Sequence, residues 1–519
     1  MLKKLRVVIS LLFFILTGFI FIDLGNWLSS TLVNKIVFLQ FFPSLLKFLN
    51  ILSFFTCGFI IIILITIVFG RVYCSTVCPL GTLQDIISYL SGKFRRFRIY
   101  RINSFSLPSN RLRYTILVIT FFTIPAGSLV ISLLDPYSNF GRIVANLFRP
   151  VYISGNDLLA VILERLGWYG LSRIGLKHID PGSLLFAFFV FVVIAALSVS
   201  KGRLFCNTIC PAGSFLGLLS RFSLFRFVFD EDSCTRCFRC EGSCKSRCID
   251  SDELTIDMSR CVSCFNCIES CPSGGMIYGI KHKPSKKVHN VDLSRRENIK
   301  TGIGVLSLIS GLSLSAARDS ISGSGINTTV PVRKKYPVTP PGSFGIEYFG
   351  KSCTACHLCI SRCPTRVLQP SVLEYGIEGI FQPFMDYSAS YCNFECTVCG
   401  NVCPTGAILP VPADEKKQLQ LGKSVFVKEN CIVEIKKTEC GACSEHCPTK
   451  AVQMAPYTGK IKIPVINNII CIGCGACEYA CPVKPYKAIY VDGNPVHLVA
   501  EKPEVKKTEK KKENGDFPF

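Results

Sequence analysis

The chain has 519 residues, 49% of them hydrophobic, and a formal net charge of +22. Its apolar residues are concentrated in the first two hundred positions, which excludes a single soluble globule and predicts a membrane part joined to further domains. Thirty cysteines in so long a chain favour metal ligation over the disulfide framework of a small secreted protein. The positive charges are spread through loops, linker and tail. Attraction to anionic lipids and the orientation of the chain in a membrane account for them, so no nucleic acid is expected as a partner.

Apolar segments in the first two hundred residues predict about four transmembrane helices, because each is near the roughly 20 residues that cross a bilayer. They are residues 5–22, 51–69, 114–134 and 184–199. Two weaker segments, 31–49 and 151–171, contain charged residues or proline and are predicted to be interfacial. The loop from Arg71 to Arg113 has eight basic residues and one acidic residue, Asp85, so the positive-inside rule places it in the cytoplasm. The N-terminus and the chain after the fourth helix then share that side.

A short motif occurs twice, each time directly after an apolar segment. GRVYCSTVCPLGT (70–82) and GRLFCNTICPAGS (202–214) share the pattern G-R-x-aromatic-C-x-T-x-C-P-x-G. Proline and glycine end helices, so one interpretation is a helix stop with small buried thiols. The equal spacing of the thiols fits one shared metal or redox site equally well. Its ligands would be Cys74, Cys78, Cys206 and Cys210.

Six runs of four cysteines follow, and they contain 24 of the 30 cysteines. A [4Fe–4S] cluster is held by four thiolates, and the run C-x2-C-x2-C-x3-C-P is typical of bacterial ferredoxins. The spacing therefore predicts about six [4Fe–4S] clusters and not structural zinc sites. The first two runs are Cys234, Cys237, Cys240, Cys244 and Cys261, Cys264, Cys267, Cys271. The later runs are Cys353, Cys356, Cys359, Cys363; Cys392, Cys396, Cys399, Cys403; Cys431, Cys440, Cys443, Cys447; and Cys471, Cys474, Cys477, Cys481.

In two-cluster domains the fourth cysteine of each run binds the neighbouring cluster. By that rule one cluster takes Cys271 as its fourth ligand after Cys234, Cys237 and Cys240, and the other takes Cys244 after Cys261, Cys264 and Cys267. Cys248 is an alternative to Cys244, although the spacing favours Cys244. The exchange of ligands among the last four runs stays open.

Residues 353–357, CTACH, also match the attachment motif of a c-type haem. Two further cysteines continue the ferredoxin run, so His357 is interpreted as a spacer and no haem is expected. The other five histidines lie outside the long apolar segments, which argues against a membrane b-type haem as well.

The first half resembles a known family. Two C-x3-C-P motifs on a helical membrane domain, followed by a two-cluster ferredoxin, resemble the NapH type of membrane polyferredoxin from periplasmic nitrate reductase systems, over residues 1–280. The segment LLDPYSNFGR (133–142) also resembles that family. The resemblance implies quinol oxidation, with Asp135 either near quinol or simply at a helix end.

The second half, from residue 340 to about 490, resembles the NapG type of four-cluster ferredoxin in PPGSFGIEYFGKSC, CPTRVLQP and CPTGAI. Between the halves, Ser294, Arg295 and Arg296 precede a weakly apolar stretch, 301–317, which resembles a twin-arginine export signal or anchor inside the chain. A basic linker with a short buried helix is the alternative. The chain thus resembles a fusion of the two types.

The predicted fold class is membrane α-helical with α+β bacterial-type ferredoxin domains. Its parts are a four-helix membrane domain (1–222), a cytoplasmic two-cluster ferredoxin (223–284), a signal or anchor helix with linker (285–340), a four-cluster ferredoxin domain (341–498) and a disordered charged tail (499–519).

The predicted function is electron transfer in the bacterial cytoplasmic membrane, from quinol or a cytoplasmic donor to a periplasmic partner protein. Activity as a quinol dehydrogenase stays open, and no residue pattern for substrate chemistry occurs. The alternatives are an assembly factor that reduces a metal or thiol in a partner oxidoreductase, and a polyferredoxin wholly on the cytoplasmic face.

Overall fold

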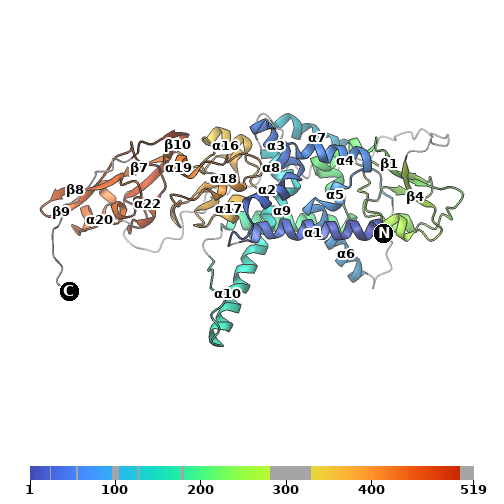
Figure 1. The fold of residues 1–519 in the computed structure, drawn as a ribbon, viewed down its shortest axis with the longest axis horizontal. Helices are drawn as coiled ribbons and strands as arrows, with labels where there is room; N and C mark the ends of the chain where they lie inside the picture. Colours follow the sequence, from blue (N-terminus) through green and yellow to red (C-terminus); the bar gives the residue numbers. More distant parts are fainter. Residues whose placement is uncertain are drawn as a thin grey trace, which may run out of the picture.

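The computed structural model describes residues 1–23, 25–53, 56–95, 105–124, 127, 129–176, 180–280 and 329–502. The predicted export-like segment and the tail after residue 502 lie outside these ranges. The described chain forms three parts in a row (Figure 1): a helical body (residues 2–220) lies between a first ferredoxin region (225–280) and a second ferredoxin region (329–502).

The helical body is built from apolar helices of very different lengths. They are α1 (Leu2–Ile22), α2 (Ser30–Phe38), α3 (Phe41–Ile51), α4 (Gly58–Phe69), α5 (Tyr73–Thr76), α6 (Pro79–Arg95), α7 (Asn110–Thr123), α8 (Leu129–Leu134), α9 (Pro136–Ile143), the π-helical turn η2 (Val144–Phe148), α10 (Arg149–Arg165), α11 (Pro181–Lys201), the π-helical turn η3 (Phe205–Ile209) and α12 (Pro211–Ser220). Helix α10 projects sideways from the body (Figure 1).

Among the described helices, α1 and α11 are long and apolar enough to cross a membrane, and α2 with α3 makes a third candidate if this pair, bent by 106°, is one span. Within the predicted span 51–69, Ile51 is the last residue of α3, Leu52 follows in the left-handed conformation (φ 50°), and α4 begins at Gly58. The predicted span 114–134 is divided into α7 and α8. Pro125, which cannot continue a helix, lies between them in the sequence.

Helices α1 and α11 run in opposite directions between the two ferredoxin regions. Lys3, at the start of α1, pairs with Glu269 of the first region, and Asp23, just after its end, pairs with Arg362 of the second. On α11 the order is reversed: Phe186 near its start packs on Phe381, with ring centroids 4.4 Å apart. The residues after its end adjoin the first region, where Arg203 N donates to Lys245 O at 3.1 Å. A 21-residue helix is about 31 Å long, close to the thickness of a hydrocarbon core.

The first ferredoxin region has two antiparallel strand pairs and two short helices. Strand β1 (Phe225–Phe229) pairs with β4 (Met276–Ile280), and β2 (Ile249–Asp250) pairs with β3 (Thr255–Ile256). Helices α13 (Arg239–Ser243) and α14 (Asn266–Ser270) each contain the third cysteine of a run. The two cysteine loops therefore lie side by side over one small core.

The second ferredoxin region repeats this pattern of short elements. Its strand pairs are β5 (Leu368–Pro370) with β6 (Pro383–Met385), β7 (Leu419–Phe426) with β10 (Ile489–Val499), and β8 (Val452–Thr458) with β9 (Ile461–Ile466). Its helices are α16 (Ile346–Ser352), α17 (Leu358–Arg362), α18 (Val398–Val402), α19 (Ala413–Lys416), α20 (Ile432–Lys436), α21 (Ala442–Glu445) and α22 (Ala476–Ala480). Its buried core is made of cysteines together with apolar side chains from these elements.

Candidate metal centres

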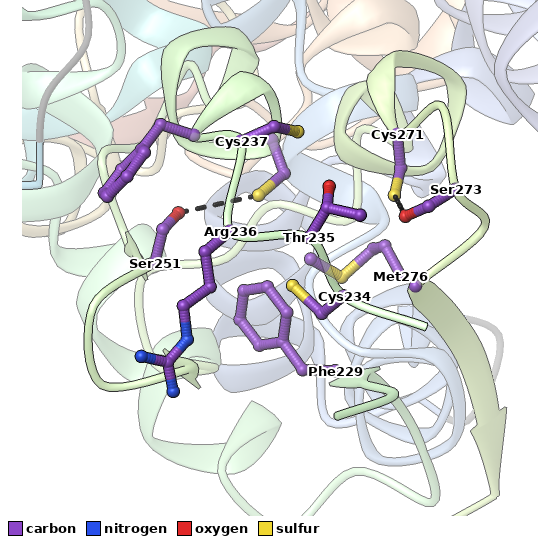
Figure 2. Close-up of a pocket in the computed structure, with 12 residues that line it drawn as sticks. Phe229, Cys234, Thr235, Arg236, Cys237, Ser251, Cys271, Ser273 and Met276 are labelled. Carbon is purple, nitrogen blue, oxygen red and sulfur yellow. Dashed lines mark hydrogen bonds between the residues drawn. The ribbon is translucent and has the colours of Figure 1, made fainter. Parts of the chain in front are cut away.

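The first ferredoxin region places four cysteines from both of its runs around one pocket (Figure 2). The pocket is enclosed by apolar side chains such as Phe229 and Met276. Ser251 Oγ lies 3.6 Å from Cys240 Sγ, so a hydroxyl also faces the thiols. The four cysteines are those that the sequence rule groups together: Cys234, Cys237, Cys240 and Cys271.

A second pocket of the same region has five cysteines in its wall. Cys248 is fully buried, and its Sγ lies 3.6 Å from Cys244 Sγ, so both candidates for the remote ligand reach the same pocket. The other three are Cys261, Cys264 and Cys267.

The second ferredoxin region exchanges its cysteines between neighbouring runs. The pKa of Cys399 is raised, first by burial and then by the negative charges of Cys392 and Cys363. Cys363, the last cysteine of one run, therefore lies beside the next run, to which Cys392 and Cys399 belong. One pocket likewise joins Cys481 to the run before it. The resulting sets are Cys353, Cys356, Cys359 with Cys403; Cys392, Cys396, Cys399 with Cys363; Cys431, Cys440, Cys443 with Cys481; and Cys471, Cys474, Cys477 with Cys447.

Backbone N–H groups are directed at several of these sulfurs. Ala355 N donates to Cys353 Sγ, and Ile408 N donates to Cys403 Sγ, each at 3.4 Å. Ala355 has a positive φ (49°), which lets the short loop wrap around the site. Such N–H donors stabilise thiolates that ligate a cluster and tune its potential.

The spacing of the thiols fits clusters better than single ions. Within the described ranges, no group of three or more His, Cys, Asp or Glu side chains converges tightly enough to hold one metal ion. A zinc ion holds its sulfurs at about 2.3 Å, so four ligands would have to lie almost in contact. Thiolates on the corners of an iron–sulfur cluster lie further apart.

The two C-x3-C-P motifs converge inside the helical body, at the ends of α4 and α11 that face the first ferredoxin region. Arg71 of the first motif donates to Cys206 O of the second at 3.2 Å, and Arg203 of the second donates to Cys74 O of the first. All four thiols are buried, each no more than 4% exposed. The structure therefore brings together the four residues that the repeat singled out, and we refer to them as the C-x3-C-P site.

Asp135 is the N-cap of α9. Its carboxylate accepts the backbone N–H groups of Tyr137, at 3.3 Å, and Ser138, at 2.8 Å. Capping accounts for its buried position, which agrees with the interpretation of Asp135 as a residue at a helix end.

His357 is more than the spacer that the sequence suggested. Its Nε2 lies 3.0 Å from Phe381 O, and its Nδ1 lies 3.1 Å from Asn146 Nδ2 of the helical body. Because a carbonyl only accepts, Nε2 carries the proton and Nδ1 accepts from Asn146. The imidazole is therefore part of the contact between the second ferredoxin region and the helical body, which no sequence signal indicated.

Comparison with known families supports the iron–sulfur assignment. A family model described as a 4Fe-4S binding domain matches residues 54–98, 183–229 and 396–417, and its first two matches enclose both C-x3-C-P motifs. A second model, described as a 4Fe-4S dicluster domain, matches residues 436–484. No solved structure matches the chain.

Several curated proteins are similar to parts of the chain. The putative electron transport protein YccM of Escherichia coli is 24% identical over 197 residues, 37% of this chain and 46% of that protein. From the same organism, the ferredoxin-type protein NapH is 26% identical over 190 residues (36% of this chain, 52% of NapH), and NapG is 26% identical over 140 residues (26% and 54%). The chain spans about half the length of the curated relatives it matches. Ferredoxin-type relatives and 4Fe-4S domains together identify an iron–sulfur protein of the electron-transfer kind.

Proposed function

We propose that this protein carries electrons across the bacterial cytoplasmic membrane, from quinol or a cytoplasmic donor to a periplasmic acceptor protein. The observation that carries the proposal is the position of the two ferredoxin regions at opposite ends of α1, which Figure 1 shows, and of α11. If both regions lay on one face, these two apolar helices would have to lie along the membrane surface. Crossing the bilayer buries them in hydrocarbon, which their exposed apolar side chains favour.

The charge pattern favours the first ferredoxin region on the cytoplasmic side. Arg6, Arg203 and Lys245 lie at this end of the helical body, and all three pair with Asp85. Excess positive charge marks the cytoplasmic end of membrane helices. The second ferredoxin region is then periplasmic, and the chain is a multi-pass membrane protein.

Six four-cysteine sets are the proposed ligands of [4Fe–4S] clusters, which would supply one-electron transfer. Two sets lie in the first ferredoxin region, with Cys244 or Cys248 as the remote ligand of the second, and four lie in the other region. The protein's own contribution is to hold these sets in a fixed order. The set of Cys353, Cys356, Cys359 and Cys403 contacts the helical body, because Cys356 belongs to the same buried apolar core as α1 and α9. At the other end, Cys264 of the first ferredoxin region packs against that core.

Sealed vesicles provide the test. Full-length protein is reconstituted into vesicles that contain ferricyanide, and dithionite is added outside. Loss of ferricyanide colour should be much faster than in protein-free vesicles. A variant with Cys356→Ser and Cys359→Ser should return to the protein-free rate, whereas Cys57→Ser, which changes a cysteine outside all these sets, should not.

Protein with intact clusters that gives only the protein-free rate would overturn the proposal. Replacing dithionite by a reduced quinone analogue then distinguishes a quinol donor from a soluble one.

A further inference from the structure

The two C-x3-C-P motifs form one closed site inside the helical body. We propose that Cys74, Cys78, Cys206 and Cys210 together hold a further iron–sulfur cluster, located between the two ferredoxin regions. The competing interpretation is that these thiols only fill space where two helices stop. Four independent features of the site separate the two.

The first feature is an exchange of arginines between the two copies of the motif. Arg71 of the first copy donates to Cys206 O of the second at 3.2 Å. Arg203 of the second copy donates to Cys74 O of the first. Each guanidinium thus fixes the cysteine loop of the opposite copy, which a simple helix stop does not require.

The second feature is the pair of glycines at the end of the motif. A Cβ on Gly81 would collide with Cys74 O, and a Cβ on Gly213 would collide with Cys206 O. Only glycine allows the following helix to approach the cysteine loop this closely. The close approach directs Gly213 N at Cys210 Sγ, 3.3 Å away, and the backbone N–H of Gly81 bonds Cys78 in the same way.

The third feature is an orphaned amide. Gln84 is fully buried, its Oε1 lies 3.5 Å from Cys206 Sγ, and its Nε2 has no partner among the described residues. Turning the amide over directs Nε2–H at the sulfur. A thiolate that ligates a cluster accepts this hydrogen bond, so ligation satisfies the orphaned donor.

The fourth feature is the balance of buried charge. Arg71 and Arg203 are fully buried, and Arg203 shares the carboxylate of Asp85 with Arg6 and Lys245, at 2.8 to 3.3 Å. Arg71 donates to neutral oxygens, Asn207 Oδ1 and Ser259 O among them. Uncompensated buried cations are costly. Four cysteine thiolates around a cluster supply negative charge here, whereas four neutral thiols supply none.

The position of the site fits a relay between the two regions, a role that rests on the proposed function. On one side, Ser263 Oγ of the first ferredoxin region donates to Phe69 O at 3.3 Å, just before the first motif. On the other side, one continuous buried core joins Cys74, Tyr137 and Cys356. The site therefore shortens the gap across the helical body, in which the sequence offers no haem ligand.

Iron and acid-labile sulfide content, with the Mössbauer spectrum of the anaerobically purified full-length protein, test the site. The double variant Cys74→Ala with Cys206→Ala should lack one cluster's iron and sulfide, with the remaining spectrum unchanged. The control Cys57→Ala, in the same helical body, should match the parent protein. Equal iron, sulfide and spectra in the double variant and the control would overturn the proposal.

A second variant covers the case in which the double variant does not fold. Gln84→Glu replaces an N–H donor with a negative charge beside Cys206, so it should lower the midpoint potential of one cluster and leave iron content unchanged. Unchanged potentials for every cluster would contradict the proposal. The vesicle assay reports separately on the proposed function, because a cluster at this site is detected by iron content even if no electron crosses.

Discussion

The two ends of α1 contact the two ferredoxin regions in different ways. Lys3 and Glu269 form an exposed pair at the first region, with side chains 38% and 53% exposed. Asp23 and Arg362 form a buried pair at the second region, each 2% exposed. The first region follows directly on α12 and is fixed by main-chain contacts such as Arg203 N to Lys245 O, at 3.1 Å. The second region is joined to the helical body by side-chain contacts, among them Asn34 Nδ2 to Asn401 O at 3.0 Å and Asn50 Nδ2 to Thr405 O at 2.9 Å.

Buried polar groups give the second contact its specificity. Asp23 also accepts N–H groups from Trp27, at 3.1 Å, and Leu28, at 2.9 Å, so both of its oxygens are bonded. A buried pair is a weak source of net stability, but removing one partner is expensive. The comparison therefore predicts that substitution at the Asp23 end of α1 strongly lowers the free energy of unfolding, and that substitution at the Lys3 end hardly changes it.

Arg362→Met should have the largest effect. It leaves Asp23 as an uncompensated buried charge, which costs about 3–5 kcal/mol. The measurement is chemical unfolding of the detergent-solubilised protein, with protease release of the second ferredoxin region as a direct report on docking. The double variant Asp23→Leu with Arg362→Met should recover much of the loss. If the single and double variants are equally unstable, packing and not charge controls this contact.

The two ferredoxin regions should also differ in their response to pH. Burial lowers the pKa of His497 in the second region to about 4, and its Nε2 lies 2.7 Å from Thr339 Oγ1. Between pH of about 6.5 and about 4 the unfolded chain binds a proton that the folded region does not, so stability falls as pH falls through this window. The loss should reach no more than about 3.5 kcal/mol, at about 1.4 kcal/mol per pH unit. His497→Gln should reduce the slope of the unfolding profile over this range without abolishing it, because burial also lowers the pKa of His357, to about 3. An unchanged slope would exclude a contribution from His497.

Between the two ends, glycine substitutions in α6 test the C-x3-C-P site. Gly81→Ala forces a methyl group against Cys74 O, and such overpacking costs about 1–3 kcal/mol. Gly92→Ala is the matched control in the same helix, because its Cβ would meet nothing within 4 Å. It should stabilise the protein by about 0.5–1 kcal/mol. Thermal unfolding of both variants measures the contrast, and equal behaviour would mean that the close approach at Gly81 is not required.

Local spacing predicted much of the cysteine arrangement. The rule that the fourth cysteine of a run serves the neighbouring cluster groups Cys271 with the first run, and the structure brings these residues together. The last four runs allowed several exchanges, and the long loop between Cys431 and Cys440 obscured the pattern further. The pairing of β7 with β10 brings Cys431, which follows β7, to the same pocket as Cys481, which precedes β10.

Contacts between distant residues were beyond sequence reasoning. The repeat shows only that each copy of the motif has an arginine at the same position. That each arginine donates to the cysteine loop of the other copy is seen only once the two copies face each other in the fold. Hydropathy likewise placed a full span at 51–69, whereas Leu52 follows the end of α3 in the left-handed conformation and α4 begins at Gly58. The role of His357 depends on Asn146, more than two hundred residues away.

Lys3→Met should have the smallest effect. Both side chains of the pair with Glu269 are in contact with water, so their attraction is screened and is offset by the entropy of fixing two long side chains. We expect the unfolding midpoint to stay unchanged at physiological salt, and any shift at low salt to disappear when salt is added. A midpoint shift comparable to that of Arg362→Met would show that the first ferredoxin region also depends on a side-chain contact. The difference in burial between the two ion pairs would then not determine how strongly each end of α1 is held.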